Sequence, residues 1–361
     1  MTVPTGVFVT SITDALFHFH FTRCELDTSK IVYNNLDQFV ASDHPNKVAC
    51  FQMPFPFKDD FYQYIDNLYD HCDRIIILCS ELHGRTVEFI KKMDREKISY
   101  FICGALNFKM QHSPVYAWHD WFITSKHFYR YVKPQVLDQL QPYAIKSRAF
   151  DILLGTRKSH RDQAYNYILT QGLKDRVVMT YFKSPSVVQK FDSIDSDEWI
   201  WPGDYTTEKN KDTNWTVTIV DYHGYRMSLS QIIPIDIYNQ TAYTLVAETN
   251  TENDWCFFTE KIVKPIIARR LFIVLGNQYY LKNLQKLGFK TFDSVINESY
   301  DTIELSSQRA GAALMQLNWL SQQPQAEVLE KIKPIVEHNY NLMMSTNWYD
   351  RYFKPSFVSY F

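Results

Sequence analysis

Short continuous apolar runs alternate with helical segments in the first half of this chain, and this alternation restricts the possible folds most strongly. Runs at 47–54, 74–80 and 98–104 have the length of strands, and the segments 57–72 and 84–97 between them repeat apolar residues at helical spacing. Apolar runs without polar alternation predict strands that are covered on both faces. Helices that connect such strands predict a parallel sheet with right-handed crossovers.

A second series of the same kind begins near residue 148, so we predict two α/β domains. Its strands are expected at 148–155, 176–182, 241–249 and 271–275, with a helix at 161–172. Segment 105–148 is expected to be helical and aromatic, 183–215 to be a polar loop or insertion, and 302–345 to be a long helical tail. The predicted division is an N-terminal Rossmann-like domain at 1–147, a C-terminal one at 148–340 and an aromatic tail at 341–361 that packs back on the first.

The bulk composition argues against several classes of function. The formal net charge of the 361 residues is −2, whereas a protein that binds nucleic acid mainly through non-specific phosphate contacts is normally basic. The chain has no apolar run long enough for a transmembrane helix and no signal-peptide pattern, so we expect a cytoplasmic protein without a membrane span. Cys50, Cys79 and Cys103 lie in or beside apolar runs and are expected to be buried free thiols.

A basic loop, "GTRKSHRD", follows the predicted strand at 148–155 and opens a helix. Ligands of open parallel sheets lie beyond the carboxyl ends of the strands, and helix N-termini attract anions. Arg157, Lys158 and Arg161 therefore form a candidate phosphate site, although a solvated basic turn explains them equally well. The single glycine matches neither a GxGxxG fingerprint nor a P-loop, which argues against a dinucleotide oxidoreductase and an NTPase.

Two further loops are expected to approach each other at the end of the second sheet. Glu248 and Asn250 follow one predicted strand, and Thr259, Glu260 and Lys261 begin the next helix. We expect Thr259 to be the N-cap and Glu260 to lie in the first turn, where the helix dipole favours an anion. A carboxylate there can accept both hydroxyls of a ribose, and a neighbouring lysine can reach a phosphate. The alternative for Glu260 is that it only compensates the helix dipole, and the alternative for Lys261 is a solvated side chain.

A third candidate site follows a strand of the first half. In "SELHG", Glu81 and His83 are separated by one residue and can act as a general base and the group that orients it. A surface loop carboxylate is the alternative. Asp195 and Asp197 form an Asp-x-Asp triplet, but they fall in the polar 183–215 segment rather than at a strand end. We therefore predict no metal site.

The stretch "YTLVAETNTENDWCFFTEKIVKPIIARRLFIVLG" resembles the nucleotide-binding segment of α1,3-fucosyltransferase-like glycosyltransferases. In that family a strand ending in Phe-Glu-Asn precedes Tyr-Val-Thr-Glu-Lys, a helix and a strand leading to glycine. Thr259, Glu260 and Lys261 match the second motif, whereas Thr249 separates Glu248 from Asn250 and departs from the first. The stretch "RKSHRDQAYNYI" is similar to the arginine-led helix of the family. The whole chain also resembles uncharacterised glycosyltransferase-like proteins of phages and marine bacteria.

The resemblance implies a GT-B architecture, in which two Rossmann-like parallel-sheet domains face each other across a cleft. It implies an inverting, metal-independent transfer from a UDP- or GDP-sugar to an acceptor hydroxyl. The basic loop and Lys261 would contact the diphosphate, Glu260 the ribose, and Glu248 or Asn250 the ribose or sugar. Glu81 or Asp120 would be the base, an inference from position alone.

The acceptor stays open between two chemistries. One is a polysaccharide or lipid-linked glycan, and the other is a hydroxymethylated base in phage DNA, which would place the enzyme in the host cytoplasm. For DNA, rings at 116–131 and in the tail would contact bases: Trp348, Tyr349, Tyr352 and Phe353. Four cations would contact phosphates: Lys126, Arg130, Lys133 and Lys146. Core aromatics and a solvated helix face are the alternatives for these residues. A non-catalytic nucleotide- or sugar-binding protein is the alternative from another class.

Overall fold

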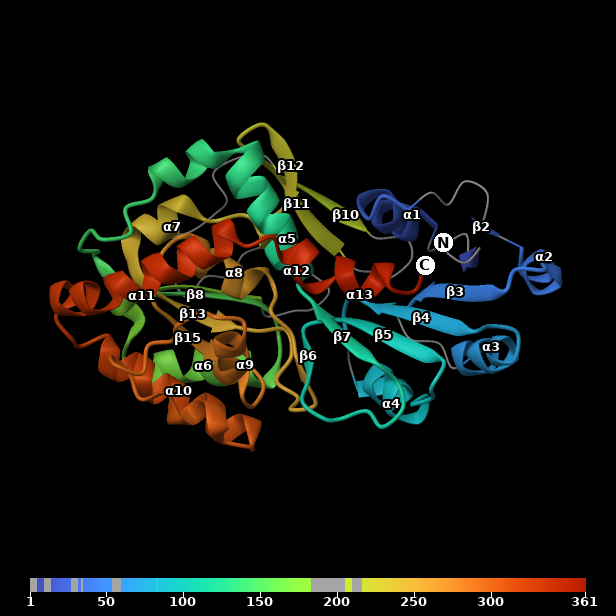
Figure 1. The fold of residues 1–361 in the computed structure, drawn as a ribbon. Helices are drawn as coiled ribbons and strands as arrows, with labels where there is room; N and C mark the ends of the chain where they lie inside the picture. Colours follow the sequence, from blue (N-terminus) through green and yellow to red (C-terminus); the bar gives the residue numbers. More distant parts are fainter. Residues whose placement is uncertain are drawn as a thin grey trace. The chain divides into compact units, whose positions relative to one another are not determined.

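The computed structural model describes residues 5–9, 14–26, 32–33, 35–53, 60–82, 84–182, 205–209 and 216–361. The chain separates into two compact units, which Figure 1 shows as ribbons. Unit 1 consists of Met1–Asp120 with Asn347–Phe361, and unit 2 consists of Trp121–Thr346. The contacts thus group residues 121–147 with unit 2 and the last fifteen residues, 347–361, with unit 1. The predicted division into domains at residues 147 and 340 stays a prediction.

Unit 1 is built on a six-stranded parallel sheet with the order β2-β1-β3-β4-β5-β7. Its strands are β1 (Thr5–Val9), β2 (Val32–Tyr33), β3 (Asn46–Gln52), β4 (Arg74–Cys79), β5 (Ile98–Cys103) and β7 (Val115–Trp118). Its helices are α1 (Asp14–Arg23), α2 (Leu36–Ala41), α3 (Asp60–Tyr69), α4 (Gly84–Lys92), α12 (Trp348–Tyr352) and α13 (Lys354–Val358), and Ala105–Leu106 form the short β6.

The predicted β-α-β-α-β series of the first half is confirmed. Every residue of β5 and all but the first residue of β4 are buried, as expected for strands with both faces covered. Phe101 of β5 contacts Phe353 and Phe357 of the tail, at 5.1 and 5.7 Å between ring centroids. Aromatic packing therefore attaches the tail to this sheet.

Two predictions for the first half were wrong in detail. Segment 105–148 was expected to be helical, yet Val115–Trp118 form an edge strand that pairs with β5. A strand of four residues is too short to show a regular spacing of apolar residues in the sequence. The helix expected at 84–97 ends at Lys92, and the Asp94 carboxylate accepts the backbone N–H groups of Gln111, His112 and Ser113 instead.

Unit 2 is built on a four-stranded parallel sheet with the order β15-β13-β8-β9. Its strands are β8 (Arg148–Thr156), β9 (Val177–Phe182), β13 (Thr241–Ala247) and β15 (Phe272–Leu275). Its helices are α6 (Ser159–Thr170), α7 (Ile235–Gln240), α8 (Glu260–Ile267), α9 (Tyr280–Lys286), α10 (Ser306–Leu320) and α11 (Gln325–Ser345). In Figure 1, α6 and α10 lie on one face of this sheet and α8 and α11 on the other.

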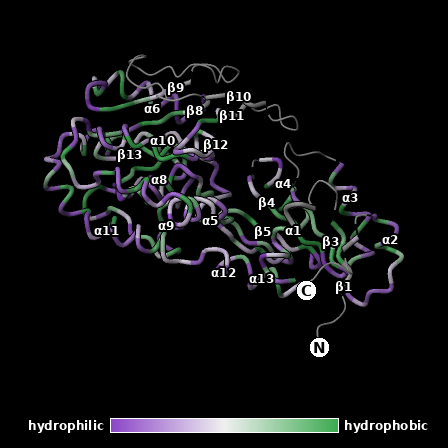
Figure 2. The backbone as a smooth tube through the Cα atoms, turned by 90° about the horizontal axis from the view of Figure 1, so that it is seen from above, coloured by the Kyte–Doolittle hydropathy of each residue, from purple (hydrophilic) through white to green (hydrophobic). Residues whose placement is uncertain are grey.

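Shorter elements complete unit 2. Helix α5 (Asp120–His127), which belongs to unit 2 from Trp121 on, leads into the π-helix η1 (Phe128–Val132) and the 3₁₀-helix η2 (Pro134–Gln139). Further 3₁₀ turns are η3 (Lys174–Arg176), η4 (Leu229–Gln231) and η5 (Glu298–Thr302), and β14 is Trp255–Cys256. Figure 2 shows hydrophobic residues along β3 in unit 1 and β13 in unit 2, in agreement with their burial.

Two other expectations for the second half need correction. Residues 205–209 were expected in a polar loop or insertion. They are not a loop, because they form β10 of an antiparallel sheet with β11 (Thr216–Tyr222) and β12 (Tyr225–Ser228). Asp195 and Asp197 lie outside the described residues. The helical tail expected at 302–345 is two helices, α10 and α11, because Pro324 precedes the first residue of the second helix.

An ion pair lies in the core of unit 2. Arg270 is 4% exposed, and its guanidinium donates to the Asp151 carboxylate at 2.8 Å. The remaining N–H groups donate mainly to oxygens at the ends of α7 and β13, among them the carbonyls of Tyr238 and Thr241 at 2.9 and 2.7 Å. Arg270 thereby connects β8, β13 and the turn before β15.

All six cysteines are free and buried, which confirms the expectation for Cys50, Cys79 and Cys103. Within the described part of the chain, no helix is both long and apolar enough to cross a membrane.

Candidate functional site

The order of the strands in unit 2 locates a topological switch point between β8 and β13. The chain passes from β8 to β9 on one side, and then returns to place β13 on the other side of β8. The connections that leave these two neighbouring strands therefore diverge, and in open parallel sheets the ligand crevice lies at the carboxyl ends of such strands. The basic loop and the Glu248–Lys261 segment follow β8 and β13 directly, so the fold places both at this crevice.

The N-terminal turn of α6 reaches across to the end of β13. Lys158 occupies the N-cap position, and its Nζ donates to the carbonyl of Thr249 at 2.6 Å. Arg161 is 5% exposed, and its Nη2 donates to the carbonyl of Glu248 at 3.3 Å. Burial lowers the pKa of Arg161, while the nearby Glu248 and Glu260 charges oppose that shift. The two cations are thus anchored on the backbone of the facing loop.

His160, which lies in the same basic loop, joins this contact. Its Nε2 lies 2.9 Å from the carbonyl of Glu248, so Nε2 carries the proton and donates. Burial lowers the pKa of His160 to about 3, and the neighbouring Arg161 adds to this shift. The imidazole is therefore neutral at neutral pH and acts as a fixed hydrogen-bond donor.

Thr259 is the N-cap of α8, as predicted. Its backbone is extended, with φ −90° and ψ −175°, and its Oγ1 accepts the N–H of Lys261 at 3.2 Å. The same hydroxyl donates to Oε2 of Glu248 at 2.6 Å. One side chain thus connects the start of α8 to the end of β13. Helix α8 continues through Pro265 to Ile267.

Glu248 is a buried carboxylate with several donors around it. It is 1% exposed, and Tyr280 Oη donates to Oε1 at 2.5 Å while the N–H of Thr249 donates to Oε2 at 3.3 Å. Burial raises the pKa of Glu248, and Lys261, Thr259 and Tyr280 oppose that rise. This carboxylate holds the loop after β13, the N-cap of α8 and the first residue of α9 together.

Glu260 and Lys261 form a charged pair in the first turn of α8. Lys261 Nζ lies 2.7 Å from Glu260 Oε1 and 3.2 Å from Thr249 Oγ1. Burial alone would raise the pKa of Glu260, but the charges of Lys261 and Lys264 outweigh it and lower that pKa. Glu260 is therefore ionised at neutral pH, at the N-terminus of a helix whose dipole also favours the anion.

The remaining two predicted donor-site residues stabilise the loops. Asn250 Oδ1 accepts the N–H of Glu252 at 3.0 Å, and its amide nitrogen donates to the carbonyl of Trp255 at 3.2 Å. Arg157 is exposed and pairs with Asp162 at 2.9 Å. Asn250 thus shapes the turn after β13, and Arg157 lies on the surface beside α6.

The basic loop after β8 and the first turn of α8 both contact Thr249. Lys158 binds its carbonyl and Lys261 binds its hydroxyl, although these lysines lie 103 positions apart in the sequence. Arg309 of α10 supports the same loop, because its guanidinium donates to the carbonyl of Thr251 at 3.0 Å and to that of Gly276 at 2.9 Å. Sequence reasoning missed Thr249, Tyr280 and Arg309, and no local pattern distinguishes them.

The two candidate bases belong to unit 1. Glu81 is half-buried and follows β4, and Asp120 is half-buried and follows β7 as the first residue of α5. Burial raises the pKa of Asp120. In the sheet of unit 1 the switch point lies between β1 and β3, so neither carboxylate follows a strand of that crevice. His83 lies outside the described residues.

Residues proposed to contact DNA are mostly engaged in packing. Lys126 Nζ donates to the carbonyl of Thr346 at 2.6 Å, and Arg130 donates to the carbonyl of Met344, so both satisfy the C-terminal end of α11. Lys146 is 6% exposed. Three of the four tail aromatics are buried in unit 1: Trp348, Tyr349 and Phe353.

Comparison with known proteins gives a weak match to a solved structure. No family model matches the chain, and no curated protein matches it. An α1,3-fucosyltransferase of known structure is similar at 11% sequence identity and a TM-score of 0.37, over 92% of this chain and 89% of that chain. Similarity at this level assigns no function. The predicted α/β class with two parallel sheets is confirmed by the structure itself and is compatible with a GT-B fold.

Among the described residues, no group of three or more His, Cys, Asp and Glu side chains is arranged to hold a metal ion.

Proposed function

We propose that this protein is a glycosyltransferase that uses a nucleoside-diphosphate sugar, and that the donor binds at the switch point of unit 2. The observation that carries the proposal is the meeting of two helix N-termini on Thr249, with Lys158 and Lys261 both bonded to that residue. Helix N-termini and cations together bind phosphate groups. An ionised carboxylate, Glu260, lies in the same turn and supplies the acceptor that ribose hydroxyls require.

Each residue has a distinct role in this proposal. Lys158 and Lys261 exchange part of their contacts with Thr249 for contacts with the diphosphate. The buried Arg161 adds positive charge to the same site. Glu260 accepts hydrogen bonds from the ribose. Glu248 is a positioning residue, because its buried carboxylate holds Thr259 rather than facing the crevice. Asn250 and Arg157 line the rim toward the sugar and the outer phosphate.

The proposed reaction is a direct displacement at the anomeric carbon. A base removes the proton from the acceptor hydroxyl, the acceptor oxygen bonds to the anomeric carbon, and the bond to the diphosphate oxygen breaks. The nucleoside diphosphate leaves with the electron pair, and the cations stabilise its developing charge. Asp120 is the preferred base, since burial raises the pKa of its carboxyl group and makes its carboxylate a stronger base, and Glu81 is the second candidate.

We propose a glycan hydroxyl as the acceptor in preference to DNA. Lys126 donates to the carbonyl of Thr346 at the end of α11, and Lys146 is buried, so two of the four predicted phosphate contacts are engaged within the protein. Retention of the protein on duplex DNA carrying hydroxymethylated bases, with an affinity that falls steeply as salt rises, would reverse this preference.

The donor assignment is tested by thermal shift and by hydrolysis of UDP- and GDP-sugars. A cognate donor at one hundred times its Kd is expected to stabilise the folded protein by about 2.7 kcal/mol. Glu260→Gln should remove most of this shift, while Glu330→Gln, on an exposed position of α11, should leave it unchanged. A full shift in Glu260→Gln would show that the nucleotide binds elsewhere. Binding without hydrolysis or transfer to any glycan would indicate a non-catalytic nucleotide-binding protein.

A further inference from the structure

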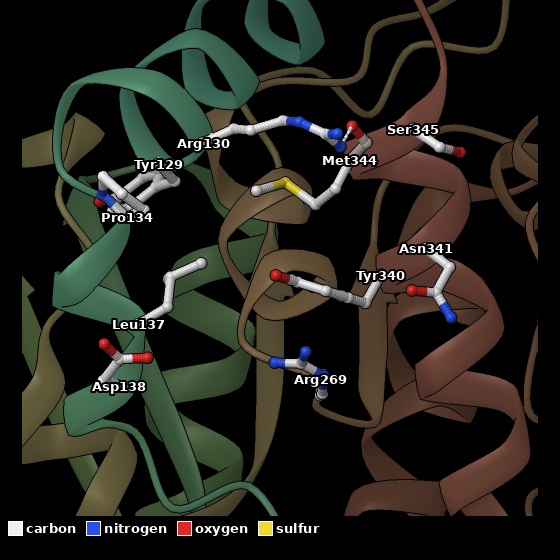
Figure 3. A pocket seen from close by; sticks show the side chains of 10 residues that line it. All are labelled: Tyr129, Arg130, Pro134, Leu137, Asp138, Arg269, Tyr340, Asn341, Met344 and Ser345. Atoms are coloured by element: carbon white, nitrogen blue, oxygen red, sulfur yellow. Dashed lines mark hydrogen bonds between the residues drawn. The ribbon is translucent and has the colours of Figure 1, made fainter.

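A pocket lies in unit 2, away from the candidate donor site. It has a volume of about 400 Å³ and is lined by η1, η2, the turn after α8 and the end of α11 (Figure 3). Arg269 in its wall precedes β15, so the pocket lies at the amino end of that strand. The switch-point crevice lies at the carboxyl ends of β8 and β13. The two sites therefore occupy opposite ends of the same sheet.

Arg269 is held in an unusual conformation at this pocket. Its φ of 55° is in the left-handed region, which non-glycine residues seldom adopt and which costs free energy. The guanidinium lies 3.5 Å from the centroid of the Tyr340 ring, and its Nε lies 3.1 Å from Glu337 Oε1. Among the described residues, no protein group accepts a hydrogen bond from its two terminal nitrogens. The stacked guanidinium thus presents an orientated pair of donors.

Arg130 supplies a second guanidinium from a different element. It lies on the π-helix η1, a conformation that occurs often at functional sites, and it donates to the carbonyl of Met344 through Nη1. Figure 3 shows Arg130 and Arg269 on separate elements of the pocket wall. In this view the Tyr340 ring lies below Arg130 and above Arg269. Two forked cations from separate walls suit one anionic group.

The rest of the lining suits a small polyhydroxylated molecule. Asp138 accepts hydrogen bonds, Asn341 and Ser345 donate and accept them, and Leu137 and Met344 provide apolar surface. Arg130, Arg269 and Asp138 are the charged residues of the lining, and Glu337 beside it pairs with Arg269. The volume falls within the range of small-molecule sites, roughly 300 to 1,000 Å³.

We propose that this pocket binds a sugar-sized ligand that carries one phosphate or carboxylate group. The anionic group binds between Arg130 and Arg269, and the hydroxyls bind Asp138 and Asn341. The proposal does not depend on the donor assignment, because the two sites share no residue. Phosphate and carboxylate are the same chemistry for a forked guanidinium, and separate titrations distinguish them.

Isothermal titration of the full chain with glucose 6-phosphate, glucuronate, glucose and inorganic phosphate tests the proposal. At least one of the two acids should bind, and glucose should bind at least about tenfold more weakly because it lacks the charge-assisted contact. Arg269→Gln and Arg130→Gln should each weaken the acid by at least about tenfold. Lys331→Gln, on an exposed position of the same helix α11, should not change its affinity.

Two further variants keep the test decisive. Asn341→Trp places a large side chain at an exposed rim position, so it should block the pocket even if the arginine variants fail to fold. Lys261→Met removes a cation of the donor site and should leave the acid bound as in the wild type. Absence of binding by both acids, equal binding of glucose, or undiminished binding in Asn341→Trp overturns the proposal. Loss of binding in Lys261→Met alone also overturns it, because the acid then occupies the donor site.

Discussion

Replacing Thr259 by valine tests whether one hydroxyl holds the candidate donor site together. Thr259 Oγ1 accepts the N–H of Lys261 at 3.2 Å and donates to Glu248 Oε2 at 2.6 Å. Valine preserves the shape of the side chain and removes both hydrogen bonds. The change therefore leaves a helix N–H without its cap and a buried carboxylate without one of its donors.

The expected loss of stability follows from these two contacts. Loss of an N-cap costs about 1 kcal/mol, and loss of a hydrogen bond to a buried charged group costs about 1.5 to 3 kcal/mol. The free energy of unfolding should fall by about 2.5 to 4 kcal/mol in total. A unit of this size loses roughly 2 to 4 °C in Tm for each kcal/mol, so Tm should fall by roughly 5 to 16 °C.

Urea denaturation followed by tryptophan fluorescence measures this change, and thermal shift with the donor measures its effect on binding. Thr259→Ser is the matched control, because it keeps the hydroxyl and loses one methyl group worth about 0.8 kcal/mol. Donor affinity should weaken in Thr259→Val and persist in Thr259→Ser, since the cap orients the turn that carries Glu260 and Lys261.

Two results would refute this reasoning. If Thr259→Val and Thr259→Ser lose the same stability, the hydroxyl does not stabilise α8. In a double-mutant cycle with Glu248→Gln, the two changes should be coupled, because they remove parts of one hydrogen bond. Simple additivity of their effects would show that the bond between Thr259 and Glu248 contributes nothing measurable.

Three further predictions follow from buried or charged groups. Arg270→Met leaves the Asp151 carboxylate buried without its cation, so urea denaturation should show that the free energy of unfolding falls by about 3 to 5 kcal/mol. The control Lys331→Met, at an exposed position, should change it very little, and equal losses in the two variants would contradict a stabilising role for the ion pair. Burial lowers the pKa of Lys264 to about 8 from its usual 10.5, although the charge of Glu260 opposes this shift. Between pH 8 and pH 10.5 the unfolded chain therefore binds more protons at this lysine than the folded protein does. Stability should therefore rise with pH across that window, and Lys264→Met should flatten the rise; an unchanged rise would exclude Lys264 as its source. Because burial raises the pKa of Asp120, transfer should decline as pH falls through that raised value, and Asp120→Asn should lower kcat by at least about a hundredfold with donor affinity retained. A wild-type pH profile in Asp120→Asn would leave Glu81 as the candidate base.

The amino-acid sequence by itself determined much of the local structure. Continuous apolar runs identified β3, β4, β5, β8, β9 and β13, because a strand covered on both faces cannot carry polar side chains at regular positions. The Thr259 N-cap was also readable, since threonine before an acidic first turn is a local signal. Short or irregular elements were not readable: β7 has four residues, and β10 lies in a polar segment.

The tertiary structure alone decided how the candidate site is assembled. The order β15-β13-β8-β9 places the strand ends at residues 156 and 247 side by side, and no local pattern in the sequence records that order. Only this neighbourhood lets Lys158 and Lys261 bind the same threonine, Thr249. It also decides that Glu248 faces four donors and acts inside the protein, whereas Glu260 lies beside Lys261 at the start of α8. The sequence shows which groups are available, and long-range packing decides which of them meet, because burial and hydrogen-bond partners depend on residues far away in the chain.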